Sequence, residues 1–293
     1  MEYGTMHVNE NYSKIVEPNL YFDAILQPGK TYNDQFQGDA NSGLVKVYKL
    51  SSDGVQDPQT PASDFSHTNA ENELIDVRLN NSQRKSKKIY KVQANAVPFA
   101  MAESYLSIAV QDCKEGWQAS GLACLAHEGT VLADTTAITT ANIKKMVIAA
   151  RAAARKGKAV PNVVMASVDV YSTMLEAAGD QYTPVTNDAM VSSGQIGKWL
   201  GMLWVECNEM ILTAAKYYDY AGTLQTEDLS GIDFIMYDWR AFSVVDNLEE
   251  IRVVDSTDFV GSLAQVEINT GYRVTTKEKV VIRKHAGATS TKM

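Results

Sequence analysis

Hydrophobic and polar positions along the chain follow two different periods, and they divide it into zones. Residues 1–40 contain few periodic apolar runs and many turn-forming pairs such as Pro28-Gly29. A short helix is predicted near residues 20–25, and the rest of this zone is typical of an extended arm. A compact monomer would have little surface of its own against which to bury such an arm.

Residues 41–93 predict a long two-stranded excursion. Apolar and polar residues alternate at 45–48, 74–79 and 88–92, and the turn-rich stretch 51–61 separates the first two runs. Val45 and Val47 share one face of the first run, whereas Lys46 and Tyr48 share the other. Each strand offers only a narrow apolar face, so the hairpin is marginal alone in water and needs a partner surface.

Residues 98–128 predict a long helix, because apolar residues recur there near helical spacing. Pro98 suits the first turn, and Gly129 can end the helix in a left-handed conformation. Gly116 and Gly121 interrupt it, which favours a bend or close packing. A straight helix of this length would span about 45 Å, which is longer than a small globular core needs.

Residues 130–245 show the pattern of a separate α/β unit. A helix capped by Thr139 or Thr140 and closed by Lys156 and Gly157 carries apolar residues at i, i+3, i+4 and i+7. A buried strand at 162–165, a helix at 169–178 and strands at 199–205 and 234–237 follow. Residues 248–284 then return to long alternating strands at 250–254, 265–268 and 279–283, before a small polar tail that is expected to fray.

Composition indicates a protein that folds without covalent staples. The 293 residues are 45% hydrophobic, which suffices for a large core. The cysteines form an odd set without a pairing pattern, which indicates apolar fillers in a reducing compartment: Cys113, Cys124 and Cys207. No apolar run is long enough to span a membrane, and the first residues lack a secretory layout, so synthesis in the cytoplasm is expected.

The net charge of −8 and a pI of about 5.1 argue against a dedicated nucleic-acid reader, which should carry a basic footprint.

Patterns that carry catalysis are absent or incomplete. Residues 194–198 resemble the end of a phosphate-binding loop, but Trp199 stands where Ser or Thr is required. Cys124 and His127 stand at i, i+3, yet a closed zinc site needs about four ligands. The adjacent pair Glu249 and Glu250 would face opposite sides of a strand. We therefore expect no catalytic residue, no metal and no cofactor, and hence no enzyme.

Two basic clusters stand out. The cations at the end of the helix in residues 140–156 complement its dipole. Residues 84–88 are interpreted as a loop-borne patch that meets acidic patches on neighbouring subunits, which would make association salt-dependent. The residues predicted to contact other subunits are Lys46, Lys49, Arg78, Arg84, Lys85, Lys87, Lys88, Glu249 and Glu250.

The order of these zones resembles the tailed-bacteriophage major capsid proteins of the Hong Kong 97-type fold, which encapsulins share. The segments that carry the resemblance are residues 160–175, 196–205 and 258–274, and they match as hydrophobic and turn patterns. The resemblance implies an α+β fold. It implies an N-terminal arm (1–40), an E-loop β-hairpin (41–95), a spine helix of the peripheral domain (96–129), an α/β axial domain (130–245), and peripheral-domain strands with a C-terminal tail (246–293).

The resemblance also implies a function and partners. The expected function is a major capsid protein that self-assembles into the icosahedral shell around a tailed phage's double-stranded DNA. Its expected partners are copies of itself as hexamers and pentamers, a portal, and packaged DNA without sequence-specific contact, with no membrane. The expected location is the virion, after assembly in the bacterial host cytoplasm.

The chain departs from some relatives of this family. It lacks a long charged helical segment at its N-terminus, which implies a separate scaffolding protein. Some members crosslink a lysine to an asparagine; Lys46, Lys49 and Asn80 lie in the right zone, but nothing supports pairing them. An encapsulin-like compartment, a phage tail or baseplate component, and a soluble hydrolase or binding protein remain as alternatives.

Overall fold

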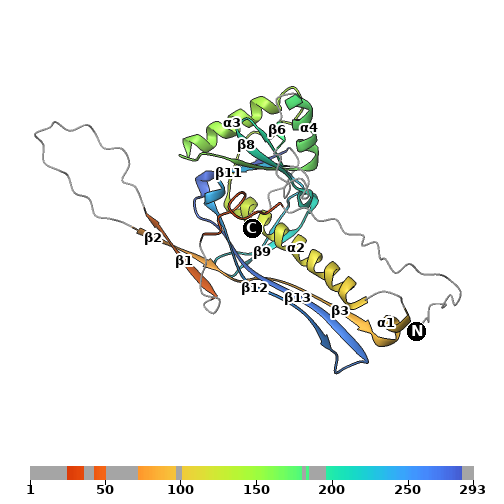
Figure 1. Ribbon diagram of the computed structural model, residues 1–293. Coiled ribbons are helices and arrows are strands. Elements are labelled where there is room, and N and C mark those ends of the chain that lie inside the picture. Colours follow the sequence, from red (N-terminus) through yellow and green to blue (C-terminus); the bar gives the residue numbers. More distant parts are fainter. Residues whose placement is uncertain are drawn as a thin grey trace, which may run out of the picture.

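The computed structural model describes residues 25–35, 43–50, 72–96, 101–179, 183–184 and 196–285. Within these ranges, a layered α/β body stands on a long three-stranded sheet (Figure 1). A two-stranded hairpin projects to the left in this view, whereas the long sheet runs to the lower right. Most of the predicted arm, the tip of the predicted excursion and the polar tail lie outside the described residues.

The body is built on a mixed sheet whose described strands run in the order β4-β14-β11-β5-β8-β7-β6. Every residue of β5 and β11 is buried, as expected for strands that are covered on both faces. The strands are β4 (Thr130–Val131), β5 (Val163–Ala166), β6 (Thr183–Pro184), β7 (Ile196–Trp199), β8 (Met202–Glu206), β11 (Ile232–Tyr237) and β14 (Val280–Lys284).

Helices cover both faces of this sheet. On one face, α3 (Ile143–Lys156) and α4 (Val168–Ala178) pack against Phe234 and Met236 of β11. On the other face, Ile235 belongs to the same core as Leu122 and Leu125 of α2 (Met101–Glu128). The buried residues of α3 repeat every three or four positions, as predicted: Ile143, Val147, Ala150 and Ala154.

The long sheet is antiparallel throughout, in the order β12-β13-β3. Its strands are β12 (Phe242–Asp255), β13 (Gly261–Val274) and β3 (Asn81–Tyr90). The N-terminal half of α2 lies across one face, where Ala109 and Cys113 pack on Val266 and Ile268. All three cysteines are buried free thiols, which confirms their predicted role as apolar fillers.

The projecting hairpin consists of β1 (Leu44–Leu50) and β2 (Asn72–Arg78). Its apolar face is narrow, as predicted, and packs near Val245 of β12: the buried residues are Val45, Val47, Ile75 and Val77. On its other face, Tyr48 is 68% exposed and Leu74 is 50% exposed. The hairpin therefore presents large apolar side chains that its own subunit leaves in solvent.

The described elements also include a smaller hairpin and three short helical turns. The hairpin is formed by β9 (Ala215–Tyr218) and β10 (Leu224–Glu227) and packs on α2. The turns are η2 (Asn208–Ile211), η3 (Trp239–Ala241) and η4 (Lys277–Lys279). None of the described helices is long and apolar enough to cross a membrane.

Two predictions about strand partners are wrong. The run predicted at 88–92 as part of the excursion belongs to β3, which pairs with β13, and it leads into α1 (Lys91–Ala96). The last strand, β14, pairs with β11 and β4 in the body, so the predicted boundary at residue 246 separates it from its sheet. Hydrophobic alternation identifies a strand, but it does not specify which strand lies beside it.

Three local predictions also need correction. The segment 199–205 is a hairpin of β7 and β8, because Leu200 and Gly201 both have positive φ, as a two-residue turn requires. Asn142, rather than a threonine, precedes α3. Gly129 does not adopt positive φ; a Cβ there would lie 2.6 Å from Cδ1 of Ile282, so close packing requires the glycine.

Candidate interaction surface on the long sheet

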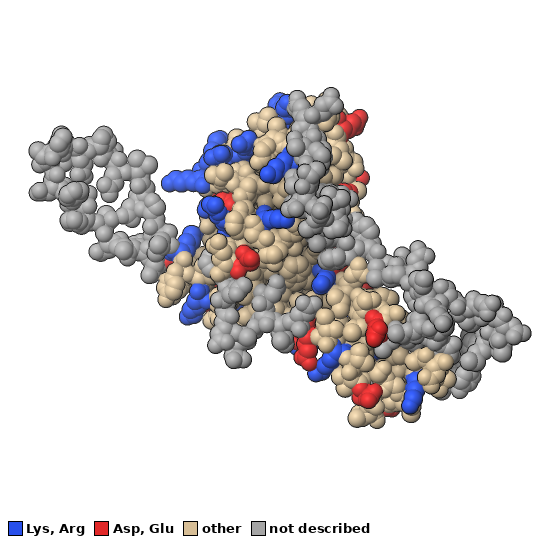
Figure 2. All heavy atoms as spheres, viewed as in Figure 1, with Lys and Arg blue, Asp and Glu red and all other residues tan. Residues whose placement is uncertain are grey.

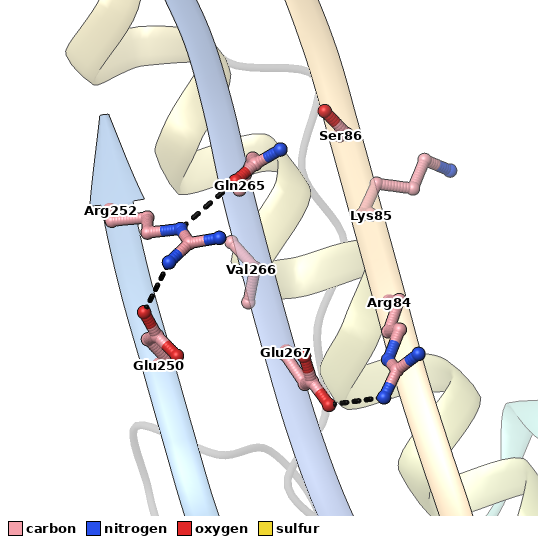
Figure 3. Close-up of a pocket in the computed structure, with 8 residues that line it drawn as sticks. All are labelled: Arg84, Lys85, Ser86, Glu250, Arg252, Gln265, Val266 and Glu267. Carbon is pink, nitrogen blue, oxygen red and sulfur yellow. Dashed lines mark hydrogen bonds and ion pairs between the residues drawn. The ribbon is translucent and has the colours of Figure 1, made fainter. Parts of the chain in front are cut away.

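The face of the long sheet that points away from α2 carries charged residues from all three strands. Arg84 of β3 lies opposite Glu267 of β13, and Glu267 lies opposite Glu250 of β12. Residues directly opposite one another in an antiparallel sheet share a face, so these three side chains form one row. A shallow hollow of about 420 Å³ lies over this region (Figure 3).

Ion pairs and hydrogen bonds order this charged row. Nη2 of Arg84 lies 2.7 Å from Oε1 of Glu267, and Nη1 of Arg252 lies 2.8 Å from Oε1 of Glu250 (Figure 3). Nε of Arg252 also donates to Oε1 of Gln265 at 2.9 Å. The hydrogen bond from Arg84 holds the pKa of Glu267 below its usual value. Because the Arg84 side chain is 69% exposed, this pair contributes at most about 1 kcal/mol.

Lys85 faces the other side of the sheet. Its Nζ lies 2.8 Å from Oδ2 of Asp112 on α2, and this hydrogen bond raises the pKa of Lys85. The predicted patch is therefore corrected in one respect, because residues 84–88 lie within β3 and not in a loop. Arg84 and Lys85 each pair with a carboxylate of their own subunit, and their contact with other subunits stays a prediction.

The remaining predicted contact residues are dispersed. Lys88 has its Nζ 5.7 Å from the ring centroid of Phe259, while Lys87 lies opposite Ala264 on the α2 side of the sheet. The hairpin carries the others: Nζ of Lys49 lies 3.4 Å from Oε2 of Glu73, and Lys46 and Arg78 are exposed.

Glu249 lies in β12 opposite Ile268, and its side chain is outside the described part of the structure. The structure thus places the side chains of Arg84 and Glu250 at one hollow, which Lys85 also lines although its side chain turns toward α2, and it leaves the hairpin cations apart from this hollow.

Sequence reasoning missed Arg252, Gln265 and Glu267, which hold the charged row together. Each is a polar position within a run that was recognised as alternating, so the available signal was the polar half of that alternation. Their contacts depend on strand register, because Arg252 and Gln265 are 13 residues apart in the chain and Arg84 and Glu267 are 183 apart.

The second basic cluster lies on the body. Figure 2 shows Lys and Arg gathered over the part of the body where α3 lies, and Arg151, Arg155 and Lys156 of α3 line a shallow hollow together with exposed Ile148. Arg155 and Lys156 occupy the last turn of the helix, where cations are favoured by the helix dipole.

The described residues offer little support for a catalytic or metal-binding site. No three His, Cys, Asp or Glu side chains among them are grouped so that they could hold a metal ion. Cys124 is fully buried, and burial raises the pKa of its thiol, whereas Nδ1 of His127 lies 2.7 Å from Oε1 of Glu227. Of the segment that resembles a phosphate-binding loop, residues 196–198 form part of β7, and residues 194–195 lie outside the described ranges.

Solved structures of phage particles resemble this chain over nearly its whole length. A chain from Mycobacterium phage Che8 matches with a TM-score of 0.67 at 16% identity, covering 95% of this chain and 97% of that one. The capsid structure of cyanophage P-SCSP1u gives a TM-score of 0.67 at 10% identity, over 96% of this chain and 93% of that one. The mature capsid of bacteriophage PhiM1 gives 0.65 at 12% identity, over 96% and 93%. This chain has a phage-capsid fold.

The capsid fold confirms the α+β class predicted from the sequence, and at the level of fold it confirms the predicted resemblance to phage capsid proteins. No protein-family profile and no curated protein matches the sequence.

Proposed function

We propose that this chain is a major capsid protein, which self-assembles into the icosahedral shell of a tailed phage. The observation that carries the proposal is the end-to-end likeness to capsid chains, which extends over 95% or more of this chain. Nothing in these likenesses favours an encapsulin-like compartment or a tail component over a capsid.

The exposed parts of the subunit support self-assembly on physical grounds. Tyr48 and Leu74 present apolar area on the projecting hairpin, and contact with a neighbouring copy would remove that area from water. Each subunit would make several modest contacts around rotational axes, and closure of the shell would multiply their effect. Copies arranged as hexamers and pentamers provide such closure.

The proposal also includes what the shell encloses, how it is assembled and where it is found. The shell encloses double-stranded DNA without sequence-specific contact, in keeping with the net charge of −8. A separate scaffolding protein and a portal take part in assembly, which occurs in the bacterial host cytoplasm. The finished location is the virion.

Electron microscopy of the expressed chain, alone and with a neighbouring scaffold gene, tests the proposal. Closed icosahedral particles are expected. Tubes or open rings would instead indicate a tail component, and a small discrete oligomer by light scattering would contradict the capsid assignment.

A further inference from the structure

Among the described residues, strand β12 forms one edge of the long sheet. From Glu250 to Asp255, β13 is its only partner among the described residues, whereas nearer its start Ser243 pairs with Asn33. An edge strand presents unpaired N–H and C=O groups, which favour the addition of another strand.

The two faces of this edge differ in chemistry. Ile251 and Val253 lie opposite the buried Val266 and Ala264, on the side of the sheet that α2 covers. They are nevertheless 44% and 46% exposed, because α2 lies mainly over β13 and β3. Glu250 and Arg252 occupy the opposite face, as Figure 3 shows at the free side of the sheet. Between residues 250 and 253, the edge is therefore apolar on the face toward α2 and charged on the opposite face.

We propose that β12 of one copy pairs antiparallel with β12 of a second copy, around a twofold axis at Ile251. In this register Ile251 lies opposite its own copy, and Glu250 lies opposite Arg252 of the second copy on the charged face. The inference rests on the proposed self-assembly and names one contact within it. It joins the long sheets of two subunits into one continuous sheet.

Charge selects this register over its neighbours. A twofold axis that preserves the two faces of the sheet can sit at any residue of the open stretch from Glu250 to Asp255. An axis at Glu250 would set that carboxylate opposite itself, and an axis at Arg252 would do the same for the guanidinium, and like charges directly opposite are unfavourable. Only the axis at Ile251 sets each Glu250 opposite an arginine, and it does so twice.

The contacts within one subunit favour the same arrangement. Glu250 lies directly opposite Glu267 in its own sheet, and Arg252 is its ion-pair partner at 2.8 Å. Arg252 of the second copy would give Glu250 another cation on its open side. The pairing would also cover Ile251 and Val253, whose exposure on an edge strand otherwise invites aggregation.

A cysteine scan at three successive positions tests the register. Ile251→Cys, Arg252→Cys and Val253→Cys are each made in the full chain, oxidised mildly, and analysed on non-reducing gels as particles and as soluble subunits. The native thiols are buried and should not interfere.

Facing residues have Cα atoms about 5 Å apart, which suits a disulfide, whereas the two copies of residue 253 would be roughly 14 Å apart. The Ile251→Cys variant should therefore crosslink to dimers about tenfold more than either control.

A charge exchange in the Ile251→Cys background tests the selection of register. Glu250→Arg alone should reduce the crosslink about tenfold, and Glu250→Arg combined with Arg252→Glu should restore it to within about twofold.

Other outcomes overturn the pairing. Preferred crosslinking at 252 or 253 indicates a different register, and particles without a crosslink at 251 indicate that another segment, such as the β1–β2 hairpin of a neighbour, covers this edge. Failure of the wild-type chain to form particles counts against the capsid function, while the crosslink in soluble chain still decides the pairing.

Discussion

The side chain of Asn81 bonds both backbone groups of Tyr218. Its Oδ1 accepts from the Tyr218 N–H at 2.8 Å, and its Nδ2 donates to the Tyr218 carbonyl at 3.0 Å. Asn81 begins β3 and Tyr218 ends β9, so a buried carboxamide joins the long sheet to the small hairpin on α2. The carboxamide bonds the N–H and the C=O of Tyr218 as the backbone of a neighbouring strand would.

Replacing Asn81 by alanine should therefore destabilise the subunit. Two backbone groups of Tyr218 would lose their partners in a partly buried region, and we expect a loss of about 2 kcal/mol in the free energy of unfolding. Urea denaturation of unassembled subunits measures it. Asn80→Ala is the matched control. Asn80 donates to the Asp219 carbonyl at 2.7 Å and accepts from Nδ2 of Asn81 at 3.0 Å, but its removal leaves both backbone groups of Tyr218 paired, so it should cost less than Asn81→Ala.

Gln118 should anchor residues 25–26 of the described segment 25–35. Its Oε1 accepts from the Ile25 N–H at 2.8 Å, and its Nε2 donates to Oε1 of Glu209 at 2.8 Å. Gln118→Leu keeps the volume but leaves a buried N–H without an acceptor, so amide exchange at Ile25 should accelerate about tenfold or more. Gln83→Leu, which removes a 3.0 Å bond to Ser120, should leave that amide unchanged. Equal acceleration in both variants would contradict the anchor.

The two glycines within α2 should respond differently to alanine. A Cβ at Gly121 would lie 2.8 Å from Cδ1 of Leu26 and 3.3 Å from Cε1 of Tyr272, within a packed core. At Gly116 it would lie 2.8 Å from Oε1 of Gln83, the end of a flexible side chain. Gly121→Ala should destabilise by about 1–3 kcal/mol through overpacking.

Gly116→Ala should stay within about 1 kcal/mol of the wild type, because the gain in helix propensity offsets the shift of Gln83. Chemical denaturation of both variants under one condition compares them. A Gly121→Ala subunit as stable as Gly116→Ala would show that the core around Leu26 yields more easily than its packing suggests.

Arg84→Gln should raise the pKa of Glu267 toward its ordinary value, because the hydrogen bond from Arg84 is the main cause of its depression. A carboxyl whose pKa is depressed stabilises the fold above its unfolded pKa, and this contribution disappears as the pH falls through the folded pKa. The stability difference between wild type and variant should therefore be at most about 1 kcal/mol at neutral pH and vanish in acid. NMR titration of the Glu267 carboxyl measures the shift, and Lys87→Gln, with the same change in charge, should leave it unaltered.

Shortening the projecting hairpin should separate folding from assembly. Residues 47–75 can be replaced by an Asn-Gly turn between Lys46 and Asp76, which keeps the Val45–Val77 pair at its base. We expect a cooperatively folded subunit that forms no closed particles by electron microscopy. Lys49→Gln, which removes only the 3.4 Å pair with Glu73, should still assemble. Particles of wild-type size from the shortened chain would contradict the role of the hairpin.

Local pattern determined a large part of this protein. The alternation around Val45 and Val47 predicted a strand with one narrow apolar face, and the spacing of Ile143, Val147 and Ala150 predicted the buried side of α3. The buried strand β5 was likewise predicted from a short apolar run, one residue too early at 162–165. These features depend on residues within a few positions of one another, and so the sequence alone contains them.

Tertiary structure decided which strands lie side by side. The hydrophobic pattern of β14 suits either sheet, and its place beside β11 depends on residues about fifty positions earlier in the chain. The contact of Arg84 with Glu267 joins positions 183 residues apart. Backbone hydrogen bonds are the same for every strand, so they do not specify which strand is the partner. The packing of the whole chain selects the partner strand and its register. Charged residues that are far apart in the sequence come into contact only as a consequence of that register.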